Sequence, residues 1–171
     1  MRVEVQGLDR CIKRLEGMKN ELETKLHKLI ERLGEIGVEV ASSGFKDAPY
    51  DGERDATVGN LTWTGDNTAE IVASGRTVLF IEFGTGVHFF TDPEGYVTSH
   101  GYGPGTYGPQ GNKDWWLYEG EPGDPNAGGE TFDKNPKMTI THGNPASRPM
   151  YEAAKEMRAN IEKIAREVFG K

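Results

Sequence analysis

The chain has 171 residues with one cysteine, Cys11, no long apolar run and no cluster of basic residues. A single cysteine cannot cross-link its own chain, so a disulfide framework is excluded and Cys11 is expected to be a small apolar residue on a helix face. No stretch approaches the ~20 apolar residues that a membrane-spanning helix needs. The N-terminus also lacks the apolar segment of a signal peptide, which predicts synthesis in a cytoplasm and no contact with a membrane.

Acidic residues outnumber basic ones, because 27 Asp and Glu stand against 20 Lys and Arg and give a net charge of −7. Nucleic-acid phosphates need cationic partners, so a chain of this charge is a poor candidate for holding DNA. The length suits a single domain, residues 1–171, with a core that needs no covalent cross-links.

The most regular pattern lies near the N-terminus, where apolar residues recur every three or four positions. This spacing predicts an amphipathic helix from about residue 9 to about residue 43. Gly17, Gly34 and Gly37 are candidate positions for a bend in it. Because strands follow and the repeat covers only about three heptads, packing against a sheet is favoured over a coiled coil. The stripe consists of Leu15, Met18, Leu22, Leu26, Leu29, Leu33 and Ile36.

Three strands are predicted next, at residues 57–64, 68–74 and 78–83, because glycine-containing turn sequences separate them. Strands that follow one another through short turns form an antiparallel meander. An alternating pattern at residues 2–5 predicts one more short strand.

The composition changes between residues 86 and 146. This insertion contains 12 of the 23 glycines and 7 of the 9 prolines, but also nine aromatic residues. A disordered linker would be poor in aromatics, so we expect an insertion that is ordered or that becomes ordered against a partner. Within it, residues 114–118 and 138–141 are expected to pair as a hairpin across a long loop.

Aromatic side chains of this insertion are candidates for contact with other subunits, because Trp and Tyr are enriched in protein interfaces. The alternative is that the pair Trp115 and Trp116 binds sugars or stacks on nucleic-acid bases. The candidate contact residues are Phe89, Phe90, Trp115, Trp116 and Tyr118.

A second amphipathic helix is predicted at the C-terminus. Pro149 suits its first turn, where the missing N–H group is not needed, and Gly170 is placed to end it. Helices and strands are therefore segregated along the chain. The predicted class is α+β, with a small antiparallel sheet packed against the two helices and a hairpin-like insertion.

Two short motifs flank the insertion. Residues 80–86 read Phe-Ile-Glu-Phe-Gly-Thr-Gly, and residues 142–150 read His-Gly-Asn-Pro-Ala-Ser-Arg-Pro-Met. Glu82 needs a partner, because an unpaired buried carboxylate is costly, and we expect a bidentate contact with Arg148. A catalytic Glu82 is the alternative, although no second acid or nucleophile stands near it in the motif.

The remaining motif residues are expected to shape the backbone. Gly84 and Gly86 suit conformations that a residue with a Cβ atom resists, Thr85 caps the turn, and Pro149 sets the entry angle of the last helix. A phosphate-binding loop is the functional alternative, but no lysine follows and no helix is predicted to start there. The structural motif consists of Glu82, Phe83, Gly84, Thr85, Gly86, Arg148 and Pro149.

Three histidines, His88, His100 and His142, raise the question of a metal site. Their spacing is irregular and the single cysteine is remote, whereas structural zinc sites take closely spaced ligands. We therefore expect no metal, no cofactor and no catalytic residues.

An apolar segment that ends in Glu-aromatic-Gly-Thr-Gly, followed after an insertion by Arg-Pro-Met at the start of an Ala-rich helix, resembles a phage tail-component family. This is the gene-product-ten-like family of the HK-ninety-seven type, comprising neck, tail-completion and head–tail joining proteins. The resemblance implies a structural role in the virion, at the neck or tail, and a ring of copies, typically a hexamer. It also implies neighbouring head-closure and tail proteins as partners, with DNA only as passing cargo.

Two other classes of function stay open at this point. One is a small metal-dependent hydrolase that uses Glu82 and the histidines. The other is a module that binds carbohydrate or nucleic acid through the aromatic insertion. Neither explains why the two motifs flank the insertion.

Overall fold

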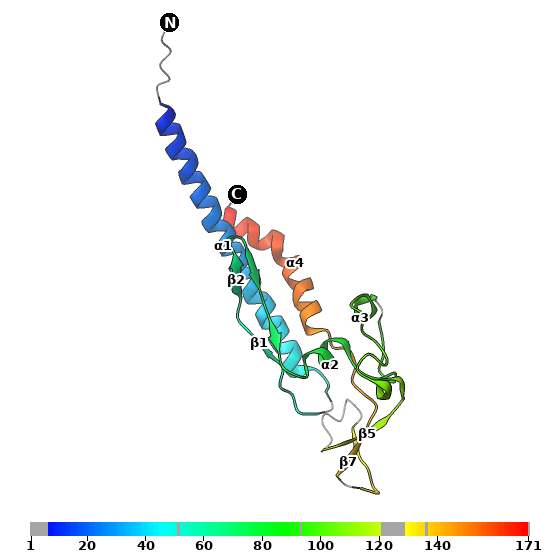
Figure 1. The fold of residues 1–171 in the computed structure, drawn as a ribbon. Coiled ribbons are helices and arrows are strands. Elements are labelled where there is room, and N and C mark those ends of the chain that lie inside the picture. The colour runs from blue at the N-terminus through cyan, green and yellow to red at the C-terminus, as the bar shows by residue number, and fades with distance from the viewer. Residues whose placement is uncertain (1–6, 51, 93, 121–128, 136, 171) are drawn as a thin grey trace.

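The computed structural model describes residues 7–50, 52–92, 94–120, 129–135 and 137–170 (Figure 1). The strand predicted at residues 2–5 lies outside them. The described helices are α1 (Leu8–Asp47), α2 (Val78–Phe83), α3 (Tyr96–Ser99), the 3-10 helix η1 (Pro109–Asn112) and α4 (Pro149–Phe169). The described strands are β1 (Thr57–Val58), β2 (Thr62–Gly65), β3 (Thr68–Glu70), β4 (Ala73–Ser74), β5 (Trp116–Glu119), β6 (Glu130–Thr131) and β7 (Met138–Thr141).

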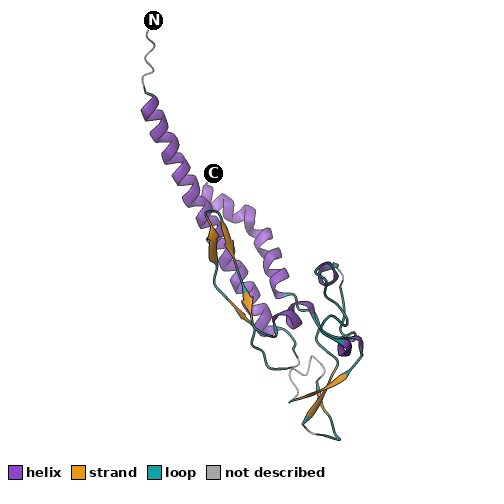
Figure 2. Cartoon of the chain, viewed as in Figure 1, coloured by secondary structure: helices purple, strands orange, loops and turns teal. Residues whose placement is uncertain are grey.

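The two long helices pack against each other in antiparallel directions (Figures 1 and 2). Gly44, near the end of α1, lies against Pro149 at the start of α4. Farther back along α1, Arg32 forms a salt bridge of 2.6 Å with Glu167, near the end of α4. Because α1 has 40 residues and α4 has 21, the N-terminal part of α1 extends beyond α4. Both predicted helices are confirmed.

Two of the three glycines proposed as bends, Gly34 and Gly37, are contact positions in a helix that runs unbroken from Leu8 to Asp47. A Cβ atom on Gly34 would lie 2.7 Å from the Leu61 side chain. One on Gly37 would lie 2.7 Å from both Ile71 and Met157. The missing side chains therefore make room for residues that follow β1 and β3 and for α4, so that these segments approach the helix axis closely.

Strands β1 to β4 form one long antiparallel hairpin in two parts, in which β1 pairs with β4 and β2 pairs with β3. The hairpin lies along α1 (Figure 2). At its tip, the His27 ring of α1 lies 4.6 Å from the Trp63 ring, and its Nε2 lies 2.6 Å from the carbonyl oxygen of Asp66. The predictions of antiparallel strands at residues 57–64 and 68–74 are thus confirmed in outline.

The prediction of a third strand at residues 78–83 is wrong, because these residues form helix α2. Residues 81–83 are all buried, and so short an apolar run does not distinguish a buried strand from a buried helical turn. Asp55 fixes the turn before α2. Its carboxylate accepts hydrogen bonds from the backbone N and the Oγ1 of Thr77, at 2.9 and 2.8 Å.

The hydrophobic core lies where the end of α1, the hairpin and α2 meet. Its buried members are Phe45, Ala48, Tyr50 and Ile81. Since burial of one such large apolar side chain contributes about 1.5–3 kcal/mol, this cluster anchors α2 and the motif that α2 carries.

The insertion forms a third small sheet, in the order β5-β7-β6. The predicted hairpin is confirmed, since Trp116 pairs with Thr141 and Glu119 with Met138 in antiparallel register. This sheet lies at the end of the molecule opposite the N-terminus of α1 (Figure 1). The fold is therefore α+β as predicted, although the sheet is divided into three small sheets among the described residues.

Within the residues that the structure describes, no helix has both the length and the apolar character that crossing a bilayer requires.

Candidate functional site

The two motifs meet at the start of α4, where Glu82 is the central residue. Its side chain is 3% exposed. Oε2 accepts a hydrogen bond from the backbone N of Met150 at 2.9 Å, and Oε1 accepts one from the backbone N of Tyr151 at 3.1 Å. The hydroxyl of Tyr96 donates a third bond to Oε1 at 2.7 Å. The carboxylate thus satisfies helix N–H groups that have no partner within α4.

The prediction that Glu82 pairs with Arg148 is wrong. No ion pair joins these two side chains, both of which lie in the described part of the chain, and Nη1 of Arg148 is buried without a hydrogen-bond partner. The Arg148 guanidinium instead lies 5.5 Å from the centre of the Tyr151 ring. Glu82 still joins the two predicted segments, but it does so through the positive end of the helix, which attracts a carboxylate as an arginine would.

A ring of aromatic contacts holds the first part of the insertion on α2. The Phe83 ring stacks on Tyr102 with centroids 4.0 Å apart, and Phe80 meets Tyr107 edge-on at 4.7 Å. The hydroxyl of Tyr107 donates to the carbonyl oxygen of Leu79 at 3.0 Å. Burial, followed by the hydrogen bond to Glu82, raises the pKa of Tyr96, so this tyrosine stays a neutral donor. Several aromatic side chains of the insertion therefore pack within the chain itself.

The turn after α2 joins the second motif through the backbone. Thr85 and Asn144 form an antiparallel bridge, and their two N–H···O bonds measure 2.9 and 3.1 Å. Gly84 has a φ of 71°, and a Cβ atom there would lie 2.7 Å from the backbone N of Ala146. This conformation and this contact both require glycine, as the sequence predicts for this position.

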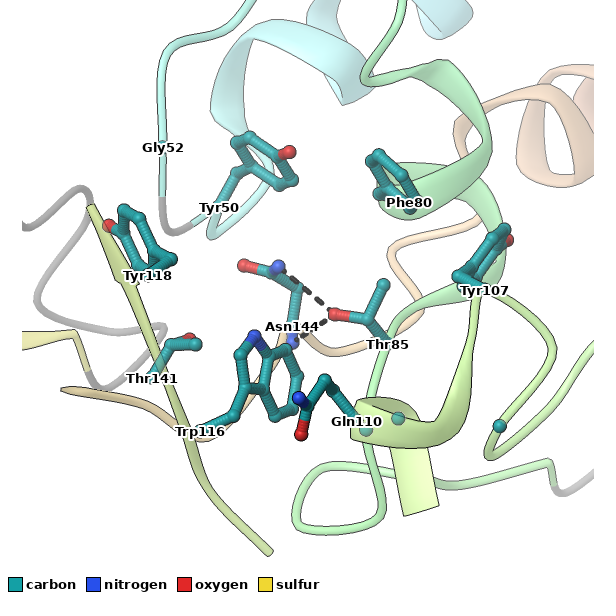
Figure 3. Close-up of a pocket in the computed structure, with 13 residues that line it drawn as sticks. Tyr50, Gly52, Phe80, Thr85, Tyr107, Gln110, Trp116, Tyr118, Thr141 and Asn144 are labelled. Carbon is teal, nitrogen blue, oxygen red and sulfur yellow. Dashed lines mark hydrogen bonds between the residues drawn. The ribbon is translucent and has the colours of Figure 1, made fainter. Parts of the chain in front are cut away.

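An aromatic pocket opens between this turn and the third sheet, with a volume of about 460 Å³ (Figure 3). Thr85 and Asn144 lie at its base, where the backbone N and the Nδ2 of Asn144 both donate to Thr85 Oγ1, at 3.0 and 3.2 Å. Five aromatic side chains contribute to its walls, namely Tyr50, Phe80, Tyr107, Trp116 and Tyr118. None of the described residues that line it is charged, so it suits an apolar or flat, uncharged group.

The candidate subunit-contact residues are divided among three environments. Trp115 is 52% exposed and Phe90 is 37% exposed, so both present apolar surface to solvent. Trp116 and Tyr118 lie on the other side of β5 and line the pocket (Figure 3). Phe89 is half-buried, with its ring edge-on to His88 at 4.7 Å.

A group of possible metal ligands lies beside the pocket. His88, Asp114 and His142 each offer one ligand atom, and the three atoms lie within 4.8 Å of one another. Two of these residues, His88 and His142, are among the histidines whose irregular spacing in the sequence argues against a metal site, and Asp114 is not among the predicted ligands. His100, the third predicted histidine, is elsewhere, with its ring 4.5 Å from that of Tyr96.

A second candidate surface is the part of the predicted apolar stripe that no described element covers. On the part of α1 that extends beyond α4, three side chains of the predicted stripe and two apolar side chains before them are between 44% and 60% exposed. They are Leu8, Ile12, Leu15, Met18 and Leu22. The sequence pattern places this stripe against a sheet, but the hairpin covers only the later part of the helix.

Comparison of the chain with protein-family models, curated proteins and solved structures gives no match in any of the three. The resemblance of the two motifs to the phage tail-component family therefore stays a prediction.

Proposed function

We propose that the chain is a structural subunit of a tailed bacteriophage or prophage, located at the head–tail junction or in the upper tail. In this proposal it assembles with copies of itself into a ring that binds neighbouring head-closure and tail proteins. DNA passes through the ring as cargo, and the net charge of −7 avoids strong contact with its phosphates.

The observation that carries this proposal is the exposed apolar stripe on the projecting end of α1. Five large side chains in one line, each at least 44% exposed, make an apolar surface that is costly to leave in water. A head-to-tail contact between copies covers such a surface, and it closes into a ring when the rotation per subunit permits.

The arrangement around Glu82 supports a structural role as well. Both carboxylate oxygens already accept hydrogen bonds from groups that hold the fold together. A general acid or base must instead reach the proton that it transfers. A hydrolase that uses Glu82 with the histidines is therefore not favoured.

The test is the oligomeric state of the full chain, measured by size-exclusion chromatography with light scattering and by electron microscopy. We expect ring-shaped particles of one size, either in concentrated solution or after mixing with the products of the adjacent genes. Those genes are expected to encode capsid and portal proteins upstream and tail-tube proteins downstream. A chain that stays monomeric in every mixture contradicts the proposal.

The aromatic pocket favours one alternative, a module that binds carbohydrate or nucleic acid. Base–aromatic stacking contributes about 1–3 kcal/mol per base, and sugars also pack on aromatic rings. Titration of tryptophan fluorescence with oligosaccharides and with single-stranded oligonucleotides tests it. Saturable quenching that Trp116→Ala abolishes supports the alternative, and an unchanged spectrum rejects it.

A further inference from the structure

We propose that His88, Asp114 and His142 form a binding site for one divalent transition-metal ion, for which Zn²⁺ is the best fit. The three residues come from three separate segments. His88 follows the turn after α2, Asp114 precedes β5, and His142 follows β7. The site is independent of the ring proposal, because it rests on different residues.

Two backbone pairings bring these segments together. Trp116 pairs with Thr141 in the β5–β7 ladder, which places Asp114 and His142 just beyond the same end of that ladder. The bridge between Thr85 and Asn144 then brings the segment that carries His88 alongside. The convergence is thus a product of the fold, and it does not depend on a chance meeting of long flexible side chains.

The side chains already face one another. Nδ1 of His88 lies 3.0 Å from Oδ1 of Asp114, and Nδ1 of His142 lies 3.9 Å from Oδ2. The two imidazole rings are 4.7 Å apart between centroids. Nδ1 of His142 also lies 2.8 Å from the backbone carbonyl oxygen of Asp114. In the tautomer that donates this bond, Nε2 keeps a free lone pair, and such an outer contact is common for metal-bound histidines.

The donor set indicates the kind of ion. Imidazole nitrogen suits Zn²⁺ and other first-row transition ions, whereas Mg²⁺ and Ca²⁺ prefer sites made entirely of oxygen. With bonds of about 2.0–2.1 Å, tetrahedral ligands lie about 3.3 Å apart. All the ligand atoms lie within 4.8 Å of one another, so the widest pair has to close by up to about 1.5 Å.

This closure is feasible because the side chains have room to move. His88 is 45% exposed, Asp114 is 62% exposed and His142 is 30% exposed. Three protein ligands leave one tetrahedral position for water. A bound ion would tie the loop after the first motif to both strands of the β5–β7 pair. It would thus fix the root of the insertion from outside the pocket.

The experiment uses the full chain without a histidine tag, stripped of metal by a chelator. Calorimetric titration with ZnCl₂ is expected to give one site per chain, and Zn²⁺ is expected to raise the melting temperature. Asp114→Asn keeps the size of the side chain, and it should weaken Zn²⁺ binding by at least ~10-fold, the lower end of the cost of losing even an outer-shell partner. The double variant His88→Gln/His142→Gln should abolish binding.

His100→Gln is the matched control, because His100 lies outside the group, and it should bind Zn²⁺ as the unmodified chain does. Co²⁺ added to the unmodified chain should give the intense visible bands of a tetrahedral site, a readout that needs no variant. The proposal is overturned if the unmodified chain gives neither heat nor these bands. It is equally overturned if Asp114→Asn, folded by circular dichroism, binds as tightly as His100→Gln.

Discussion

At the scale of single residues, the Glu82 side chain caps the N-terminus of α4, a helix that is distant from it in the sequence. The N-cap position of α4 is Arg148, which has a φ of 54° and makes no capping bond through its side chain. Glu82 replaces that bond from 68 residues away, by accepting from Met150. A carboxylate at this end of a helix is stabilised by the helix dipole and by charge-assisted hydrogen bonds.

Replacing this carboxylate should destabilise the fold. Glu82→Gln has nearly the same shape, but its amide nitrogen cannot accept the bond from a helix N–H group. We expect a loss of about 1–3 kcal/mol in the free energy of unfolding, measured by urea denaturation, because a buried donor is left unsatisfied. Glu39→Gln, on an exposed site of α1, is the control and should stay within about 0.5 kcal/mol. Equal effects of the two changes would contradict the role assigned to Glu82.

The charge on Asp55 should make the stability of the fold depend on pH. The Nε of Arg76, its backbone N and both donors of Thr77 hydrogen-bond to the carboxylate, and they hold the pKa of Asp55 well below its usual range. A carboxylate with a lowered pKa stabilises the folded state above its unfolded pKa of about 3.9 and loses this contribution as the pH falls further.

The expected result is a pH-dependent difference between the unmodified chain and Asp55→Asn. At pH 7 the unmodified chain should unfold at a higher urea concentration than the variant. The gap should shrink as the pH falls below about 4, because the Asp55 contribution is lost there. A gap that stays constant down to acid pH would show that the charge of Asp55 contributes nothing.

At the scale of elements, the glycines of α1 differ in function according to what faces them. A Cβ atom on Gly17 would point into open space, with no described residue outside its own stretch of helix within 4 Å, since Gly17 lies on the projecting part of α1. At Gly44 a Cβ atom would lie 2.9 Å from the Cβ of Pro149 and 3.2 Å from its Cα. A proline ring cannot rotate away, so this contact limits how closely α1 and α4 approach.

Alanine at these two positions should therefore have opposite effects. Gly17→Ala should stabilise the chain by about 0.5–1 kcal/mol, the usual gain within a helix. Gly44→Ala should destabilise it by about 1–3 kcal/mol, because it overpacks the contact with Pro149. Urea unfolding followed by helical circular dichroism measures both. Stabilisation by Gly44→Ala would mean that the two helices can move apart at little cost.

At the scale of the whole molecule, the shape is long and its two ends differ. The projecting end of α1 lies at one end, and the β5–β7–β6 sheet lies at the other (Figure 1). Both ends carry exposed apolar residues, with Leu15 at 60% and Trp115 at 52%. A subunit with distinct apolar surfaces at opposite ends is suited to head-to-tail contacts, in which one surface meets a different surface of the next copy.

Charges placed in the α1 stripe should prevent assembly without unfolding the subunit. We expect Leu15→Glu/Leu22→Glu to turn the proposed ring into monomers, because both side chains are exposed in the single subunit, at 60% and 58%. Light scattering measures the mass, and thermal unfolding checks that the monomer is intact. Asn20→Glu/Thr24→Glu adds the same charge on the opposite side of the helix and should leave the ring unchanged. Rings that survive the first change would exclude this stripe as the contact.

Sequence reasoning about the site succeeded where the backbone alone decides. It predicted the backbone role of Gly84, since the conformation of a turn is a local property. It also predicted that residues 114–118 pair with residues 138–141, since two short strand patterns lie on either side of one long loop. It failed on the partner of Glu82, because the partners are backbone N–H groups. Nearly every residue has such a group, so no residue type in the sequence marks it as a partner. It also failed to predict that His88 and His142 lie close together. Their separation along the chain gives no information on the two backbone pairings that bring them together.

The sequence by itself determined the two long helices, the hairpin strands, the α+β class and the glycine turn, because periodicity, capping and backbone preference act over a few neighbouring residues. Only the tertiary structure decided that residues 78–83 are helical, because so short an apolar run suits either conformation. Only the tertiary structure decided which part of the α1 stripe is covered. A periodic pattern shows that a surface is apolar, but what covers it depends on how far the neighbouring elements extend.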